Sequence, residues 1–425
     1  MADSAPSGPA TTGAGPGRPA VSRGATAPKQ APKSPGGSAA ARRDPRLDVL
    51  RGLALVMIFI NHVPGNAYEA FTNRNFGFSD AAEGFVFMSG VAAALAYGPR
   101  LAQGFSWQGV KRPWRRAWTL YLVHLAGTVI ALGISAAGAL WLGTEAMVQE
   151  NNVATLIDDP LRGWIGLAVL SHQLGYMNIL PIYALLLMAT PLLLVAAWRV
   201  PRTLLAASIV AWLGAGAWRI GLPTWPVESI WFFNPLSWQL LFVLGLLTGI
   251  AAKGGRAFVA ATPARIAVAA AIVAVILLWA QWDALGARLN EVMFSLRDTA
   301  APDFLFDYDK TFVSGPRLVH FLALAYLLSA LPQVRAACAS RWAEPLATLG
   351  RHGLTVFALG TVLAFAAQVA KARAVALGVE GLDLDTAVIA AGLGIQYLVA
   401  RVKETSARRR RAEQARMRAA LAANR

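Results

Sequence analysis

Arg51 and His62 combine the residue types and the spacing that a proton-transfer site within a membrane would need. A neutral imidazole accepts a proton from a hydroxyl near neutral pH. An ionisable side chain inside an apolar segment is costly and is a functional hypothesis by default. On a helix the two positions lie within about 20° of a common face and about 16 Å apart along the axis. One helix face would therefore carry a cation at one depth and a general base at another. Asp48, near Arg51 in the chain, is a further candidate catalytic residue.

Each of these residues also has a simpler interpretation. Arg51 could be an anchor that reaches the membrane surface and pairs with Asp48, three positions earlier in the chain. His62 could be a packed or capping histidine at the end of a helix. Asp80 and Glu83 could orient the imidazole of His62, but their spacing is also that of a capping box at a helix N-terminus. The capping and catalytic roles are compatible, and the sequence leaves them open.

Amide and aromatic side chains gather in two further segments, at 176–183 and 231–239. Aromatic belts at the membrane surface explain many such residues, but aromatic faces beside amide groups also suit a sugar. The candidate binding residues in these segments are Asn178, Tyr183, Asn234, Trp238 and Gln239.

The remaining histidines and the single cysteine give no metal pattern. No two histidines have HxxxH or HExxH spacing, so we expect no metal site. Cys338 is alone, which excludes an intrachain disulfide framework and an iron–sulfur site. We interpret the other four histidines as structural: His124, His172, His320 and His352.

The elements that must position these residues are membrane helices. The chain is 56% hydrophobic and 15% charged, whereas soluble domains carry about 25% charged residues. Ten apolar segments are long enough to span a bilayer, so we expect an all-α polytopic membrane protein. They cover 47–63, 79–98, 114–142, 176–198, 203–220, 232–252, 263–282, 314–331, 346–370 and 384–402. The apolar stretch 161–175 is too short to cross, and we interpret it as interfacial or re-entrant.

The net charge of +16 indicates the orientation of these spans. With the N-terminus in the cytoplasm, most of the 39 Lys and Arg residues lie on the cytoplasmic side, and most of the 23 acidic residues lie outside. An even number of spans then places both termini in the cytoplasm. The basic excess is therefore a topology signal, and we expect no nucleic-acid binding.

Composition divides the chain into three parts. Residues 1–43 are rich in Pro, Ala and Gly and lack an apolar run, so we expect a disordered cytoplasmic tail without a cleaved signal. The ten-span domain covers 44–405. Residues 406–425 form a basic cytoplasmic tail.

Several motifs between residues 44 and 90 resemble the OpgC family. They are Asp-Pro-Arg-Leu-Asp-Val-Leu-Arg-Gly-Leu-Ala from Asp44, Phe-Ile-Asn-His ending at His62, the run from Asn73 to Glu83, and Phe-Val-Phe-Met-Ser-Gly ending at Gly90. The ten-residue gap between Arg51 and His62 also resembles the signature of the wider membrane acyltransferase-3 superfamily. Segments 178–183 and 234–239 are similar to further OpgC-type motifs, and the resemblance extends over about 42–405.

The resemblance implies an enzyme of the bacterial inner membrane. Members of this family transfer a succinyl group from cytoplasmic succinyl-CoA to hydroxyls of a periplasmic glucan. Arg51 would then face the acyl-CoA donor, and His62 would activate the sugar hydroxyl or carry the acyl group. Asn61, Asn73 and Arg74, which lie in the matching motifs, become candidates for substrate binding. The expected partners are the acyl-CoA, the glucan and the lipid bilayer, with no bound cofactor.

Two other classes of function compete with this one. A ten-span carrier that exports an acylated or anionic solute would also explain the helices and Arg51. Such a carrier predicts helices broken at mid-membrane in paired halves, and the sequence shows no evident two-fold pattern. A scaffold that recruits partners through its basic tails has less support.

Overall fold

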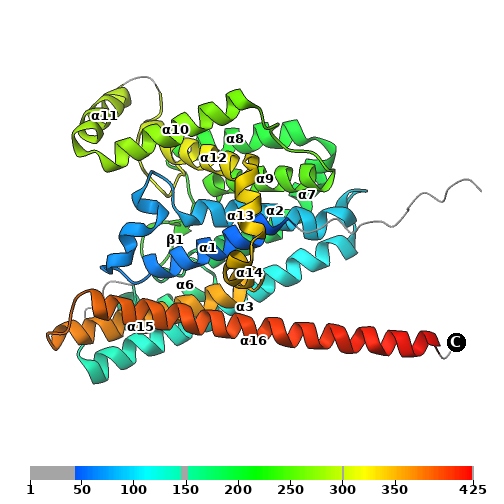
Figure 1. Cartoon of the computed structure of the whole chain (residues 1–425). Coiled ribbons are helices and arrows are strands. Elements are labelled where there is room, and N and C mark those ends of the chain that lie inside the picture. The colour runs from blue at the N-terminus through cyan, green and yellow to red at the C-terminus, as the bar shows by residue number, and fades with distance from the viewer. Residues whose placement is uncertain (1–43, 145–151, 299–300, 424–425) are drawn as a thin grey trace, which may run out of the picture. The chain divides into compact units, whose positions relative to one another are not determined.

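The computed structural model describes residues 44–144, 152–298 and 301–423. This part of the chain is almost entirely helical (Figure 1). The longer helices are α1 (Pro45–Asn61), α2 (Ala81–Leu101), α3 (Trp107–Leu142), α7 (Ile179–Arg199), α8 (Pro201–Ala217), α9 (Pro235–Lys253), α10 (Pro263–Gln281), α11 (Asp283–Ser295), α12 (Gly315–Ala330), α15 (Gly353–Ala376) and α16 (Leu382–Ala423). The short elements are η1 (Ala67–Phe71), η2 (Asn73–Asn75), α5 (Ala154–Asp158), α6 (Pro160–Ala168), β1 (Pro223–Thr224), β2 (Ser229–Ile230), η3 (Leu296–Asp298), η4 (Asp303–Phe306), α13 (Pro332–Ala339), η5 (Arg341–Ala343) and α14 (Glu344–Arg351).

Nine of the ten predicted spans each overlap one helix, and the ninth, 346–370, overlaps α14 and α15. This agreement supports the all-α membrane class. In the described residues seven helices are long and apolar enough to cross a membrane: α2, α3, α7, α9, α10, α15 and α16. The bent pair α12 and α13 makes an eighth if it counts as one span. Helices α1 and α8, with 17 residues each, are shorter than the ~20 residues of a full span. The number ten and the side of the termini therefore stay predictions.

Local capping fixes where the functional helices begin. The carboxylate of Asp44 accepts a hydrogen bond from the backbone N–H of Arg46, and Pro45 follows as the first residue of α1. Asp80 and Glu83 form a capping box at the start of α2. The capping interpretation of this acidic pair is therefore confirmed. Whether the pair also orients His62 depends on the residues around it.

Glycines let the central helices pack with their backbones in contact. A β-carbon at Gly90 of α2 would overlap the carbonyl oxygen of Phe242 in α9, and one at Gly245 would overlap that of Phe87. Helix α1 packs as closely on α14, because a β-carbon at Gly350 would overlap the carbonyl oxygen of Asp48. Small residues permit such close approach between membrane helices. These contacts hold α1 and α2, which carry the candidate residues, against the rest of the bundle.

Several described segments between the long helices also form regular structure. Within the stretch 161–175, α6 ends at Ala168 and is too short to cross a membrane. The helix α11 lies between the predicted spans 263–282 and 314–331. The antiparallel strands β1 and β2 pair Pro223 with Ile230. Helix α16 continues from the tenth predicted span through most of the basic segment to Ala423 (Figure 1).

Candidate active site

A cavity of about 410 Å³ lies at the C-terminal end of α1 and includes His62 in its wall. We name it the His62 cavity. Its volume is within the usual range for small-molecule sites. Its polar wall comes from Asn61, His62, Arg74, Asp80, Asn178 and Lys310, and its aromatic wall from Tyr176, Phe232, Phe233 and Phe357.

The backbone and the ring of His62 are both held in place. Its N–H caps α1 by donating to the carbonyl of Ile58 (3.0 Å), and its own carbonyl accepts from the amide of Gln368 in α15 (2.7 Å). The imidazole lies against the ring of Tyr176, with centroids 4.8 Å apart. Tyr176 has a φ of 63°, which is uncommon for a residue with a side chain. The imidazole is thus positioned at the end of a helix and beside an aromatic wall.

Four charged side chains form a cluster, two of which, Asp80 and Lys310, line the His62 cavity. The carboxylate of Asp80 pairs with Lys310 and, at 3.3 Å, with Arg317. The fully buried Glu83 pairs with the same guanidinium. Burial by itself would raise the pKa of Asp80, but the charges of Lys310 and Arg317 outweigh it and hold the pKa below its usual range. The carboxylate is therefore ionised near neutral pH.

Sequence reasoning missed both cations of this cluster. Arg317 lies inside the eighth predicted span, so the rule that singled out Arg51 could have found it. Lys310 lies in a loop and gives no local signal. Its backbone carbonyl accepts from the indole N–H of Trp238 (3.0 Å), and its ammonium lies 5.5 Å from the ring centroid of Phe233. These contacts direct a loop lysine into the His62 cavity.

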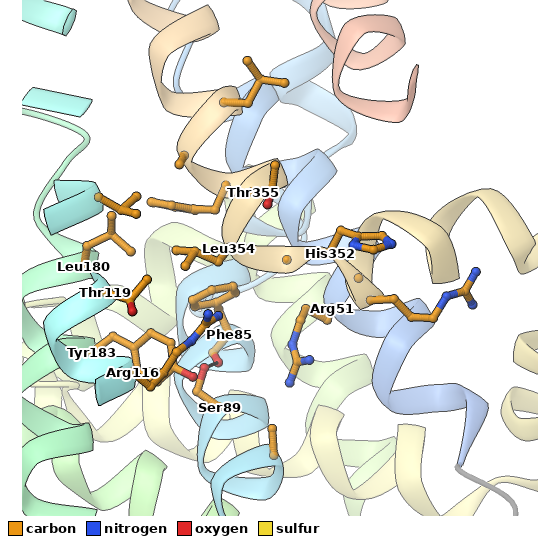
Figure 2. Close-up of a pocket in the computed structure, with 18 of the residues that line it drawn as sticks. Arg51, Phe85, Ser89, Arg116, Thr119, Leu180, Tyr183, His352, Leu354 and Thr355 are labelled. Atoms are coloured by element: carbon orange, nitrogen blue, oxygen red, sulfur yellow. Dashed lines mark hydrogen bonds between the residues drawn. The ribbon is translucent and has the colours of Figure 1, made fainter. Parts of the chain in front are cut away.

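A larger cavity, of about 1040 Å³, contains Arg51, and we name it the Arg51 cavity. Arg51 donates a hydrogen bond to the carbonyl of Met88 in α2 (3.2 Å). Figure 2 shows Arg51 on one side of this space and Arg116 with Tyr183 on the other. The basic residues in its wall are Arg51, Arg116, Arg351, His352 and Lys403, and much of the rest is apolar. A cavity of this kind suits an anionic ligand with an apolar or extended part.

The two cavities meet at Phe357, which lines both. Their walls also share α7, since Ile179 faces the His62 cavity and the next residue, Leu180, faces the Arg51 cavity. Arg51 and His62 thus contribute to successive chambers from the same helix. An extended donor held in one chamber could present its reactive end to the other.

The predicted binding residues separate into three groups. Asn61, Arg74 and Asn178 line the His62 cavity, and Tyr183 lines the Arg51 cavity. The predicted binding residue Asn73 lines neither of these cavities, and neither does the candidate catalytic residue Asp48. The third group comprises Asn234, Trp238 and Gln239, which also lie outside both walls.

The third group packs α9 against its neighbours. The side chain of Asn234 caps α9 at the backbone N–H of Leu236 (3.1 Å), and its amide donates to the carbonyl of Ile220 (2.7 Å). The amide of Gln239 accepts from the hydroxyl of Ser208 in α8 (2.6 Å). These contacts give both side chains a structural role. Trp238 acts on the site indirectly, because its indole N–H binds the backbone carbonyl of Lys310.

Other histidines have partners within the fold. His320 accepts through Nδ1 from the backbone N–H of Ser79 (3.1 Å), and His352 pairs with Glu404 (3.0 Å). Among the described residues, no three His, Cys, Asp or Glu side chains gather as a metal site.

The family comparison places the whole site within one matched region. No curated protein and no solved structure matches the chain. The family model described as "OpgC protein" matches residues 43–408. This range contains every residue that lines the two cavities and covers most of the chain. The chain therefore belongs to the OpgC family.

Proposed function

We propose that the protein is a multi-pass O-acyltransferase of the bacterial inner membrane. It transfers an acyl group, succinyl in this proposal, from a cytoplasmic acyl-CoA to a hydroxyl of a periplasmic glucan. Membership of the OpgC family supports a glucan-modifying acyltransferase. The single observation that carries the proposal is the pair of chambers, in which Arg51 and His62 extend from one helix into cavities that meet at Phe357.

The Arg51 cavity is the proposed donor site. An acyl-CoA combines phosphate groups with a long, weakly polar arm, and the wall offers basic residues around an apolar space. Arginine and lysine side chains bind phosphate through charge-assisted hydrogen bonds. The arm would then pass Phe357 with its thioester toward His62. No further cofactor enters this proposal.

The His62 cavity is the proposed reaction chamber. A glucan hydroxyl attacks the thioester carbonyl while the imidazole of His62 accepts the hydroxyl proton. A new C–O bond forms, the C–S bond breaks, and the proton passes from the imidazolium to the departing thiolate of CoA. Lys310 supplies a positive charge in the same cavity, where negative charge develops on the carbonyl oxygen. A transient acyl group on His62 is the alternative course of the same reaction.

Mass spectrometry of periplasmic glucans tests this function directly. A deletion strain that carries the wild-type gene should produce acylated glucan, and the His62→Ala variant should produce none while it still inserts in the membrane. The matched control is His172→Ala, because His172 lines neither cavity. Near-normal acylation by the His62 variant would refute its assigned role. Acylated glucan that stays in the cytoplasm of the deletion strain would favour an exporter instead.

A further inference from the structure

A third cavity, of about 560 Å³, lies beside the His62 cavity. Arg74 lines both. We name it the Trp279 cavity. It is built where α10 meets α11, against the loop before α2 and the loop before α12. Gly286 permits the tight approach of α11 to α10, because a β-carbon there would lie 2.6 Å from the carbonyl oxygen of Trp279.

Three aromatic rings form one side of the Trp279 cavity. The ring of Phe78 meets that of Trp279 edge to face, with centroids 5.2 Å apart, and lies 4.7 Å from that of Tyr308. The side chains are half-buried, so they are packed by the fold and still border the space. Rings held in this way offer rigid apolar faces to a ligand.

A single amide holds two of these rings by their polar ends. The side-chain oxygen of Asn290 accepts from the indole N–H of Trp279 (2.9 Å) and from the hydroxyl of Tyr308 (2.6 Å). Burial raises the pKa of Tyr308 to about 12, so the phenol stays neutral and remains a donor at neutral pH. Asp283, Arg74 and Arg317 add charged groups around the rings. The wall thus alternates fixed aromatic faces with polar groups.

An aromatic belt at the membrane surface explains Trp282 better than Trp279. Trp282 is 59% exposed and does not line the cavity, as expected for a belt residue. The indole N–H of Trp279 is bound inside the protein to Asn290, and its ring borders the cavity. The two tryptophans on one helix end therefore provide a matched pair for experiment.

We propose that the Trp279 cavity binds a sugar unit of the glucan next to the unit that is acylated in the His62 cavity. A sugar ring has an apolar C–H face, which suits an aromatic wall, and a rim of hydroxyls, which suits amide and charged groups. The shared residue Arg74 joins the two cavities into one path for a polymeric acceptor. The inference rests on the proposed function and adds that the enzyme selects a chain over a single sugar.

The test uses the full chain in lipid nanodiscs with glucan purified from the deletion strain and cut into oligomers of defined length. Binding is measured by calorimetry without donor, and kcat and KM are measured with donor. Trp279→Ala should weaken oligomer binding and raise KM about tenfold, with kcat and the KM for methyl glucoside nearly unchanged. Trp279→Phe should recover most of the affinity, and Trp282→Ala should behave as wild type.

Failure of the inference can be told from failure of the function. Wild-type protein that acylates glucan with the same KM as Trp279→Ala would refute the inference and leave the function standing. Oligomer binding that depends on Trp279 without any acylation would support the sugar site and refute the enzyme. If Trp279→Ala does not fold, Asp283→Ala replaces it, because Asp283 is exposed on the same wall. It should weaken oligomer binding in the same direction, and unchanged binding would refute the inference.

Discussion

Lys310 links the charge cluster to the chamber that contains His62. It pairs with the Asp80 carboxylate, and it lines the His62 cavity. A lysine that is already held in position needs little rearrangement to stabilise negative charge that develops nearby. At the scale of single residues, the proposed site thus combines a base, His62, with a cation, Lys310, that the Asp80 carboxylate holds in the same cavity wall.

Replacing Lys310 by methionine tests this arrangement. We expect kcat/KM for glucan acylation to fall at least ~100-fold, as when an oxyanion-stabilising donor is lost. Lys310 also holds the pKa of Asp80 low, so Asp80 should take up its proton at higher pH in the variant. The acid limb of the kcat/KM profile should then move to higher pH.

Lys371→Met is the matched control for this substitution. Lys371 pairs with Asp385 at 2.6 Å and lines none of the three cavities. Its loss should leave the pH profile unchanged. If the two lysine variants showed the same profile, Lys310 would have no special role near the reacting groups.

The sequence predicted the residues of this site that are close together in the chain. Arg51 and His62 were found because their spacing puts them on one face of a helix. Asp80 was found from its capping pattern. Lys310 is 230 positions from Asp80, and only the packing of α12 beside α2 brings its loop to the cavity. The amides of Asn234 and Gln239 were attractive by type, but residue type does not show that helix caps and α8 already use them.

At the scale of elements, the contact between α2 and α9 keeps the bundle in register. The backbones touch at Gly90 and Gly245, so both helices are fixed by shape as well as by apolar burial. Ser89 and Phe85 line the Arg51 cavity from α2. A change in this helix contact should therefore alter the Arg51 cavity, the proposed donor site.

Gly90→Ala should destabilise the protein. Its β-carbon would overlap the carbonyl oxygen of Phe242, so the helices must separate at a cost of about 1–3 kcal/mol. We expect a lower thermal unfolding temperature in detergent. Gly133→Ala is the control, because Gly133 lies in α3 and, apart from the adjoining backbone of α3 itself, nothing lies within 4 Å of its added β-carbon. Equal unfolding temperatures for the two variants would show that the contact has no tight geometry.

Hydropathy located the long helices because each buries an apolar stretch of membrane length. It could not find α11, whose 13 residues mix charged and apolar side chains. It also missed the break at His352 between α14 and α15, where the ninth predicted span reads as continuous. These features depend on contacts with other helices, and a single apolar profile does not contain them.

At the scale of the whole molecule, three short helices decide the topology. Helices α1, α8 and α12 have 17, 17 and 16 residues and would be about 24–26 Å long. Their length is close to the ~30 Å thickness of the hydrocarbon core. Local thinning of the bilayer, or flanking side chains that extend to the membrane surface, can compensate for the shortfall in length. If all three span, the count is ten and even. If only the seven long helices span, the count is odd and the ends of the described domain lie on opposite sides.

Labelling with a membrane-impermeant maleimide separates these topologies. In a Cys338→Ser background, single cysteines replace Arg288 on α11 and Ala415 on α16, both of which are exposed. With ten spans, Arg288→Cys should react in cells whose outer membrane is permeable, and Ala415→Cys should react only after lysis. This result would support the proposed cytoplasmic donor and periplasmic acceptor. Reaction of Ala415→Cys in intact cells would place α16 outside and remove the basis for a cytoplasmic donor at Lys403.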